Sequence, residues 1–168
     1  MSMSQQPRQL STDIYIPTMV AEKVVLPFAA IGRNIRSVLE RHLAHAHEGK
    51  CNGEGYVRPQ STQVITHSSG TLTDYGAVAF EVMYEYQACN PVEGMLITCV
   101  VQTVTQAGLH AYILPEPSPV VIFVSRDHHY SNSHFSKIKV GDEITVRVIG
   151  RHFELNDPAV SVIAELSK

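Results

Sequence analysis

A series of β-rich segments decides how the second half of the chain folds. They read GMLITCVVQTVTQAGLHAYI (Gly94–Ile113), VVIFVS (Val120–Ser125), KVGDEITVRVIG (Lys139–Gly150) and AVSVIAEL (Ala159–Leu166). The first segment holds two strands separated by a glycine turn, so five strands are expected in all. Each strand is rich in β-branched residues and is bounded by glycine, proline or aspartate. Five short strands suit a small closed barrel, because closure leaves no exposed sheet edge.

The first half is predicted to form one long helix on a small antiparallel sheet. Between Pro27 and Ala46, apolar residues recur every three or four positions, which predicts an amphipathic helix of about 20 residues. The segment Val78–Ala88 alternates apolar and polar side chains, as does a strand with one buried face. Ile14–Leu26 is also β-rich, but Pro17 cannot donate to a ladder, so either an edge strand or a strand with a break is expected.

The chain is therefore predicted to contain an α+β domain followed by an all-β barrel. Asn90–Gly94 interrupts the strand pattern and marks the boundary between them. We expect a disordered polar tail at 1–12, the α+β domain at 13–91 and the barrel at 92–168.

Composition narrows the range of functions. Residues 1–91 carry 7 Lys/Arg and 8 Asp/Glu, and residues 92–168 carry 6 and 8, so neither half has the positive surplus that duplex DNA binding needs. Three widely spaced cysteines predict neither a disulfide framework nor a zinc site, and they favour a reducing compartment. The longest apolar runs are too short to cross a membrane. We expect no membrane association, no metal and no cofactor.

The order of these pieces resembles the larger stalk subunit of archaeal and eukaryotic RNA polymerases. EGKCNGEGY (Glu48–Tyr56) is similar to the E-G-x-C-x-x-x-G-Y segment of that family. VAFEVMYEYQACNPVEGMLITCVVQTVTQAGLHAYI (Val78–Ile113) resembles its linker and first barrel strands, and Lys139–Gly150 a late strand of its S1-type oligonucleotide-binding barrel. The likeness extends from about Ile14 to Glu165.

The chain departs from the family pattern at three places. Cys89-Asn90 stands where the family usually has phenylalanine, Leu109-His110 replaces an aromatic residue beside the glycine, and Pro117–Pro119 replaces a glycine. The aromatic surface of the barrel is therefore thinner than in most S1 domains. Such divergence would suit a large DNA virus that encodes its own polymerase.

The resemblance implies a non-catalytic subunit of a DNA-directed RNA polymerase. Its first domain is expected to dock on the core subunits near the clamp, beside a smaller stalk subunit. The barrel is expected to offer nascent single-stranded RNA a weak guiding surface. The expected location is with the transcription machinery, in the nucleus or in a viral factory or virion. The predicted docking residues are Gly49, Cys51, Gly53, Gly55, Tyr56 and Gly70.

Candidate RNA-contact residues lie on the predicted barrel. Outward aromatic side chains on its middle strands can stack on bases, and arginine can meet a phosphate. The polar loop Ser125–Lys137 adds hydrogen-bonding and stacking groups. A strand phenylalanine also suits a core position, and the loop also suits plain solvation. The candidates are His110, Tyr112, Phe123, Arg126, His128, His129 and Arg147.

Two other functions remain open from the sequence. One is a free-standing S1-type protein, which should bind single-stranded RNA with a steep salt dependence. The other is a metal-dependent enzyme that uses the histidine-rich loop, since histidine clusters attract zinc. The sequence contains no nucleophile elbow, no glycine-rich phosphate loop with lysine and no evident pair of catalytic acids, so we expect no catalytic residue.

Overall fold

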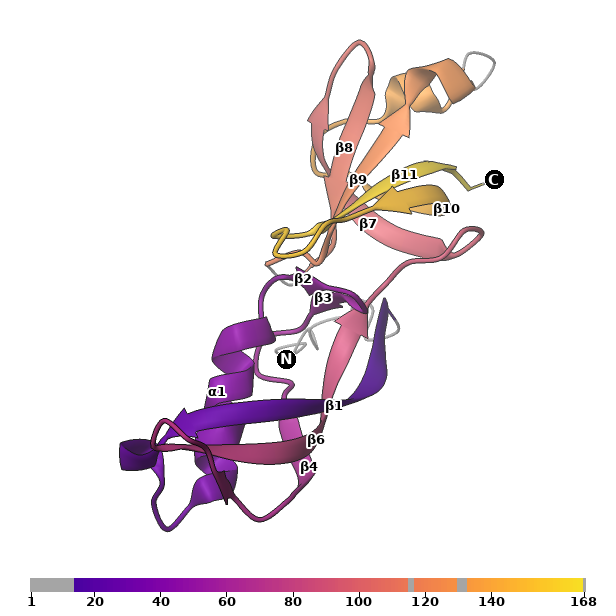
Figure 1. The fold of residues 1–168 in the computed structure, drawn as a ribbon. Coiled ribbons are helices and arrows are strands. Elements are labelled where there is room, and N and C mark those ends of the chain that lie inside the picture. The colour runs from indigo at the N-terminus through magenta and orange to yellow at the C-terminus, as the bar shows by residue number, and fades with distance from the viewer. Residues whose placement is uncertain (1–13, 115–116, 130–132, 168) are drawn as a thin grey trace, which may run out of the picture. The chain divides into compact units, whose positions relative to one another are not determined.

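The computed structural model describes residues 14–114, 117–129 and 133–167 (Figure 1). These residues form two compact units. The sheet–helix unit comprises Tyr15–Asn90 together with the later segment Glu154–Pro158. The barrel unit contains residues 91–153 and 159–167. The predicted tail at 1–12 lies outside the described residues.

A strand of 13 residues, β6 (Ala77–Cys89), organises the sheet–helix unit. It pairs antiparallel with β1 (Tyr15–Pro27) along the full length of both strands. On its other side β6 pairs with three short strands, β3, β4 and β5. The fourth short strand, β2, pairs with β3, so the sheet order is β1-β6-β3-β2. The four are β2 (Cys51–Asn52), β3 (Gly55–Val57), β4 (Gln63–His67) and β5 (Thr71–Leu72).

The predicted strands of this unit are confirmed, whereas the predicted length of the helix is wrong. The alternation at Val78–Ala88 falls within β6, and Pro17 lies on the edge strand β1. The helix α1 (Ile35–His47) has 13 residues and begins only after the short 3-10 helix η2 (Phe28–Ala30). It starts late because Asn34 caps it, accepting a hydrogen bond from the Ser37 N–H at 3.3 Å.

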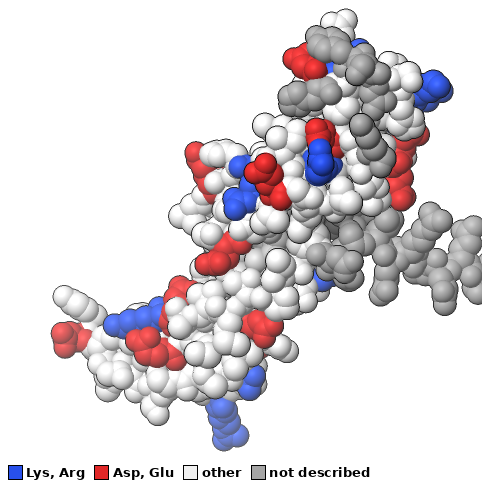
Figure 2. Space-filling model, turned by 90° about the vertical axis from the view of Figure 1, so that its right-hand side faces the viewer, with Lys and Arg blue, Asp and Glu red and all other residues white. Residues whose placement is uncertain are grey.

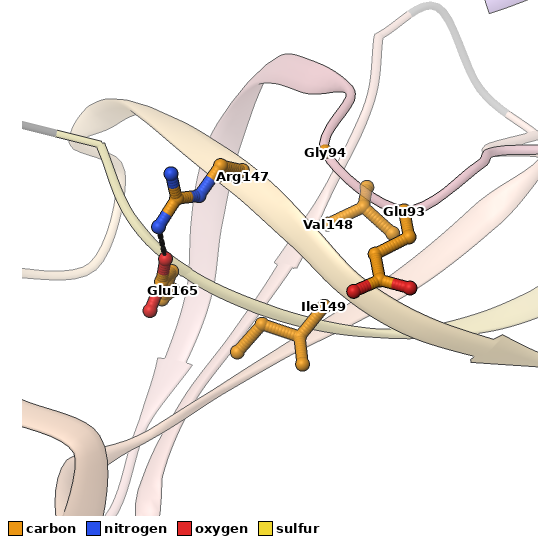
Figure 3. A pocket seen from close by; sticks show the side chains of 6 residues that line it. All are labelled: Glu93, Gly94, Arg147, Val148, Ile149 and Glu165. Carbon is orange, nitrogen blue, oxygen red and sulfur yellow. Dashed lines mark hydrogen bonds and ion pairs between the residues drawn. The ribbon is translucent and has the colours of Figure 1, made fainter.

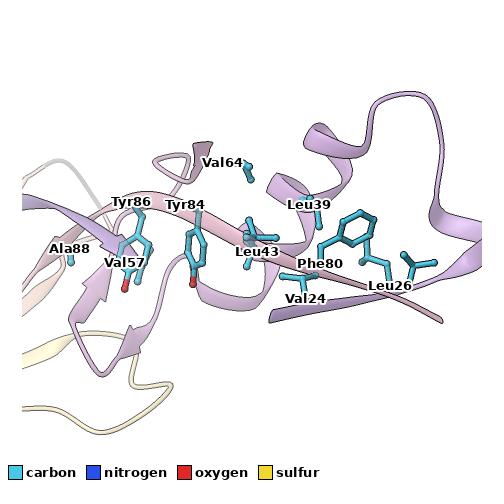
Figure 4. Packing of buried hydrophobic residues seen from close by; sticks show 12 residues of the cluster. Val24, Leu26, Leu39, Leu43, Val57, Val64, Phe80, Tyr84, Tyr86 and Ala88 are labelled. Carbon is cyan, nitrogen blue, oxygen red and sulfur yellow. The ribbon is translucent and has the colours of Figure 1, made fainter. Parts of the chain in front are cut away.

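The core of the sheet–helix unit lies between α1 and one face of the sheet (Figure 4). Leu39 and Leu43 of the helix are fully buried. They belong to one cluster with Val24 and Leu26 of β1 and with alternate residues of β6, including Phe80. Period-four spacing on the helix and period-two spacing on the strands bring these side chains to one layer.

Side chains of α1 cover the free edge of β4. The Glu40 carboxylate accepts a hydrogen bond from the Val64 N–H at 2.8 Å, and the Arg36 guanidinium donates to the Val64 carbonyl. Directly after the last residue of α1, Glu48 accepts from the Thr62 N–H at 3.1 Å. These groups satisfy backbone atoms that an edge strand would otherwise expose, which protects the edge from pairing with another chain.

The barrel unit is a closed barrel of five strands, consistent with the predicted oligonucleotide-binding type. Its order is β10-β11-β9-β8-β7, with the parallel pair β11–β9 and otherwise antiparallel pairs. The strands are β7 (Leu96–Val104), β8 (Gly108–Tyr112), β9 (Val120–Ser125), β10 (Glu143–His152) and β11 (Val160–Leu166). Two 3-10 helices, η3 (Arg126–His129) and η4 (Phe135–Lys137), lie in the chain between β9 and β10.

Side chains alternate between the inside and the outside of the barrel. On β8 and β9, Leu109, Ala111, Ile122 and Val124 are fully buried, and the residues between them are at least partly exposed. Gly108 is the exception, because it is buried on the outer side of the strand. The alternation predicted from the sequence thus fixes which side chains can meet a ligand.

Candidate interaction surfaces

The glycine-rich segment Gly49–Tyr56, predicted to dock, forms a hairpin that is buried at Cys51, Gly55 and Tyr56 and exposed at Gly49, Gly53 and Glu54. Cys51 pairs with Tyr56 across β2 and β3, and Tyr56 pairs in turn with Cys89 of β6. Cys51 and Tyr56 each expose only 1% of their surface. These two side chains therefore hold the hairpin on the sheet and are not available as a docking surface.

Gly55 is required by the close approach of two backbones. It has φ +114°, and a Cβ atom at this position would lie 2.4 Å from the carbonyl oxygen of Cys89. Gly49 also has a positive φ, of 75°, but has open space around it, and Gly53 is exposed with open space and no such φ. Among the hairpin glycines, only Gly55 is constrained both by φ and by space.

A late segment of the chain completes the hairpin. The Cys51 N–H donates to the Asp157 carbonyl at 2.8 Å, and the Asn156 N–H donates to the Cys51 carbonyl at 2.8 Å. Both partners belong to Glu154–Pro158, which connects β10 to β11 but belongs to the sheet–helix unit. This pairing links residues far apart in sequence, so no local pattern could have predicted it.

Cysteine and tyrosine side chains form a row across four strands of the same sheet, in the order Tyr15, Cys89, Tyr56, Cys51. Burial is the main cause that raises the pKa of the Cys51 thiol from its usual 9.0 to about 11, and Asp157 adds to it. Burial likewise raises the pKa of Cys89 to about 12. Both thiols are therefore protonated near neutral pH, which makes them poor nucleophiles.

A polar network joins the end of α1 to β1 and β6. Glu22 accepts a hydrogen bond from the Tyr84 hydroxyl at 2.7 Å, and His47 lies 3.0 Å from the same carboxylate oxygen. The His47 ring also stacks on the Tyr84 ring, with centroids 6.0 Å apart. Burial, followed by this hydrogen bond, raises the pKa of Tyr84 far above its usual value. The network fixes the last turn of the helix and satisfies a buried hydroxyl.

Exposed apolar side chains gather instead at the end of the sheet where β6 begins. Phe28 follows β1, Leu72 lies on β5, and Tyr75 lies in the turn between β5 and β6; they expose 65%, 69% and 97% of their surface. The register places all three at this end of the sheet, because Pro27 pairs with Ala77 and Leu72 with Val78 on the other side of β6. We call Phe28, Leu72 and Tyr75 the turn patch.

The sixth predicted docking residue, Gly70, lies beside the turn patch. A Cβ atom on Gly70 would lie 2.5 Å from the Val78 Cγ1 atom and 3.1 Å from the Phe80 ring. Gly70 itself is exposed. Its lack of a side chain leaves room for Val78 and Phe80 to close the core under the turn. Gly70 was predicted from its match to a family turn. The apolar residues of the turn patch were missed because their exposure cannot be read from the sequence.

Three predicted RNA-contact residues share the outer side of the barrel. His110 and Tyr112 alternate with buried residues of β8, and Phe123 of β9 pairs with His110. The rings of His110 and Phe123 lie with centroids 5.1 Å apart at an interplanar angle of 48°. All three side chains are partly exposed, so aromatic surface remains available on these middle strands.

Arg126 and His129 are used to hold the loop that follows β9. His129 is buried; its Nδ1 lies 2.7 Å from the Ser125 carbonyl, and its Nε2 accepts from the Leu166 N–H at 3.0 Å. Arg126 lies over the Phe135 ring and donates to the Thr105 carbonyl at 3.1 Å. Neither ring nitrogen of His129 is free for a base. The His128 side chain lies outside the described part of the structure.

Arg147 lines a surface pocket of about 600 Å³ on the barrel unit. Figure 3 shows its guanidinium joined to the Glu165 carboxylate, with Glu93 set apart from this pair. Two carboxylates and one guanidinium give the pocket an excess of negative charge, which disfavours a phosphate. The remainder of the lining is Gly94, Val148 and Ile149.

Charge is also mixed on the one face that Figure 2 shows. On the face in Figure 2, basic and acidic side chains are interspersed without a large area of one sign. Within residues 14–114, 117–129 and 133–167, no group of three His, Cys, Asp or Glu side chains could hold a metal ion. In the same residues, no helix has the length and apolar character needed to cross a membrane.

No model of a protein family matches this chain, and no curated protein matches it either. Function must therefore be inferred from the fold and from the turn patch and barrel surfaces described above.

Proposed function

We propose that the chain is a non-catalytic stalk subunit of a multisubunit DNA-directed RNA polymerase. The sheet–helix unit docks on the core subunits near the clamp, and the barrel, of the S1 type, offers nascent RNA a weak guiding surface. A smaller stalk subunit is a further expected partner. The arrangement of a one-helix sheet unit and a closed five-stranded barrel supports the resemblance found in the sequence.

The observation that carries this proposal is the turn patch. A large apolar side chain that exposes most of its surface gains free energy when a partner covers it. Tyr75, which exposes 97% of its surface, is also of the residue type that most often anchors protein interfaces. Docking is therefore assigned to Phe28, Leu72 and Tyr75, with Gly70 as their support. Of the hairpin glycines, Gly55 has a structural role, because a side chain there would meet the backbone of β6.

The barrel contributes the surface on which RNA contact is proposed. His110, Tyr112 and Phe123 lie outward on β8 and β9, the middle strands by which oligonucleotide-binding folds take their ligands. This same observation favours the alternative, a free-standing single-stranded RNA-binding protein. The alternative predicts RNA binding without any polymerase, so recovery of the native complex distinguishes the two.

Affinity purification of the tagged chain from its native source, at moderate salt, tests the proposal. Mass spectrometry should identify the large polymerase subunits. Replacement of Leu72 and Tyr75 by serine should abolish their recovery, because both side chains are exposed and contribute little to folding. Val140→Ser is the matched control, since Val140 is an equally exposed apolar residue of the barrel unit and its loss should change nothing.

The exposed positions of the turn patch make this experiment decisive. Replacing Gly55 or Tyr56 would perturb a buried hairpin, so a lost interaction could not be separated from misfolding. Circular dichroism should show that the serine variants keep their secondary structure. Recovery of RNA without polymerase would refute the stalk assignment, and full recovery with the double variant would refute the role of the turn patch.

A further inference from the structure

The long strand β1 of the sheet–helix unit keeps one open edge. It pairs with β6 on one side only, and no strand of the described residues pairs with its other side (Figure 1). Elsewhere the chain covers edges of this kind: Glu40 and Arg36 bond to β4, Asn156 and Asp157 bond to β2, and the barrel is closed. An open edge carries a row of unpaired N–H and C=O groups, which another strand can bind.

The hydrogen bonds of β6 show which backbone groups of β1 face the open edge. The N–H and the carbonyl of Gln87 both bond to residues just before β4, and those of Glu81 both bond to Ser68, just after β4. Facing residues of an antiparallel pair exchange both hydrogen bonds or neither. The β1 partners of Gln87 and Glu81 are Pro17 and Lys23, which therefore direct their backbone groups away from β6.

Every second residue of β1 shares this orientation, because the direction of the backbone groups alternates along a strand. The register between β1 and β6 is continuous, so the alternation holds from one end of β1 to the other. Pro17 and Pro27 belong to the same set and lack an N–H, so they cost no bond to β6 and mark the two ends of the open edge. The donors between them are the N–H groups of Met19, Ala21, Lys23 and Val25.

The side chains along this edge are mostly apolar, with one acid and one base at adjacent positions. Met19 and Val25 lie on the face of the sheet opposite α1 and expose 59% and 48% of their surface. Lys23 lies on the same face and is exposed. Glu22 lies on the helix side and is partly exposed; both of its contacts described above involve one carboxylate oxygen, so the other oxygen has no partner among the described residues.

We propose that the open edge of β1 binds an extended segment of a partner protein, which adds a strand antiparallel to β1. An acidic residue of the segment lies opposite Lys23, and the basic residue that follows it lies opposite Glu22. Apolar residues of the segment lie beside Met19 and Val25. Main-chain hydrogen bonds supply the affinity, and the two charges fix the register. The inference does not depend on the stalk assignment, which rests on the turn patch.

A second copy of β1 fits this edge less well than a partner of that chemistry. Glu22 and Lys23 cannot face each other across two copies, because their backbone groups point in opposite directions. A two-fold axis at residue 22 sets two glutamates opposite each other, and one at residue 23 sets two lysines opposite each other, which is destabilising. An axis elsewhere along β1 leaves both charges opposite uncharged residues. Only a different strand can neutralise both.

Amide hydrogen exchange of the full chain, followed by NMR, tests the inference with a synthetic peptide. The peptide has nine residues of valine and threonine, except for glutamate in third place and arginine in fourth. In the chain alone, the N–H groups of Met19 and Ala21 should be at least about tenfold less protected than those of Val20 and Glu22, which point to β6. Millimolar peptide should slow the exchange of the first pair by about tenfold or more, because each then bonds to the peptide.

The same peptide with its two charged residues exchanged is the matched control. It sets like charges opposite Glu22 and Lys23, and it should bind at least about fivefold more weakly. Lys23→Glu should bring the two peptides within about twofold of each other, since each then makes one favourable and one unfavourable pair. Lys139→Glu, the same change at an exposed lysine of the barrel unit, should leave the preference intact.

Ala21→Pro separates binding from folding. The Ala21 N–H points away from β6, so its loss spares the ladder with β6, as Pro17 does at the same edge. This variant should keep the protection of Val20 and Glu22 and lose the response to the peptide.

The remaining outcomes overturn the inference. If Met19 and Ala21 are already protected in the chain alone, the edge is covered without a partner; light scattering then shows a dimer if a second copy covers it and a monomer if the chain itself does. Absence of protection at millimolar peptide, or equal binding of the peptide with exchanged charges, would also refute it. None of these results affects the recovery of polymerase subunits through the turn patch, so the two proposals fail separately.

Discussion

Replacing the hairpin glycines one at a time should separate two physical costs. Gly53→Ala meets open space at an ordinary φ and should change the free energy of unfolding by less than about 0.5 kcal/mol. Gly49→Ala also meets open space but at φ +75°, so it should cost about 1–2 kcal/mol for the left-handed conformation. Gly55→Ala combines an unfavourable φ of +114° with a Cβ atom 2.4 Å from the Cys89 carbonyl oxygen.

The clash at Gly55 cannot be relieved by a side-chain rotation, because the opposing atom belongs to the backbone of β6. Separation of β3 from β6 would break backbone hydrogen bonds and open the buried Tyr56. We expect a total cost of about 3–5 kcal/mol for Gly55→Ala, a large share of the 5–15 kcal/mol that stabilises an ordinary domain.

Urea unfolding followed by tyrosine fluorescence measures these costs. Five of the seven tyrosines, residues 15, 56, 75, 84 and 86, lie in the sheet–helix unit, so the signal reports mainly on that unit. The expected order of stability is Gly53→Ala, then Gly49→Ala, then Gly55→Ala. If Gly55→Ala lies within about 1 kcal/mol of Gly49→Ala, the close approach of β3 to β6 contributes nothing and the structural assignment of this glycine is incorrect.

Two further perturbations test the interior. The three buried thiols have pKa values raised from 9.0, to about 11 for Cys51 and about 12 for Cys89 and Cys99, so the unfolded chain releases these protons first. Stability should be constant below about pH 8 and fall above about pH 9 by about 1.4 kcal/mol per pH unit for each thiol; urea midpoints that do not change up to about pH 10.5 would contradict this. His129→Phe keeps the stack on Phe135 but loses both hydrogen bonds, and should cost about 1–3 kcal/mol in thermal unfolding, against less than about 0.5 kcal/mol for His110→Phe on the surface.

The regular elements were predictable because their signals are periodic and local. The five barrel strands and β6 follow from alternation between turn residues, which the folded chain preserves. The helix was predicted too long because the apolar spacing continues through residues 28–34, whereas a capping asparagine decides where the helix starts. A cap is a short-range signal that competes with periodicity, and at Asn34 the cap prevails.

The site residues were harder to predict because their roles depend on distant partners. Arg147 points outward as expected, but its guanidinium forms an ion pair with Glu165 on another strand. His129 was chosen for its polar loop, yet it is buried, with one ring nitrogen beside the Ser125 carbonyl and the other accepting from the Leu166 N–H. The chemistry of one residue shows which contacts its side chain can make, whereas the strand order determines which residue lies beside it.

The glycine motif shows that a segment recognisable in the sequence need not form an exposed binding surface. Glu48–Tyr56 is one of several segments that resemble the stalk family, and a docking loop was expected there. In the folded chain, Cys51 and Tyr56 are buried and a Cβ atom on Gly55 would meet the backbone of β6, so these three residues of the motif are needed to pack the hairpin on the sheet. Residues needed for a fixed hairpin tolerate little change, whereas a docking surface can vary with its partner.

A surface that varies with its partner leaves no motif to recognise, and only exposure reveals it. The turn patch fits this description, because Phe28, Leu72 and Tyr75 come from separate elements and reach the same end of the sheet only through the pairing of β1 and β5 with β6. If the stalk assignment is correct, the core polymerase must present a complementary apolar pocket to this patch. Serine replacements in the patch should then release the chain from the polymerase without unfolding it, and the hairpin variants should unfold it first.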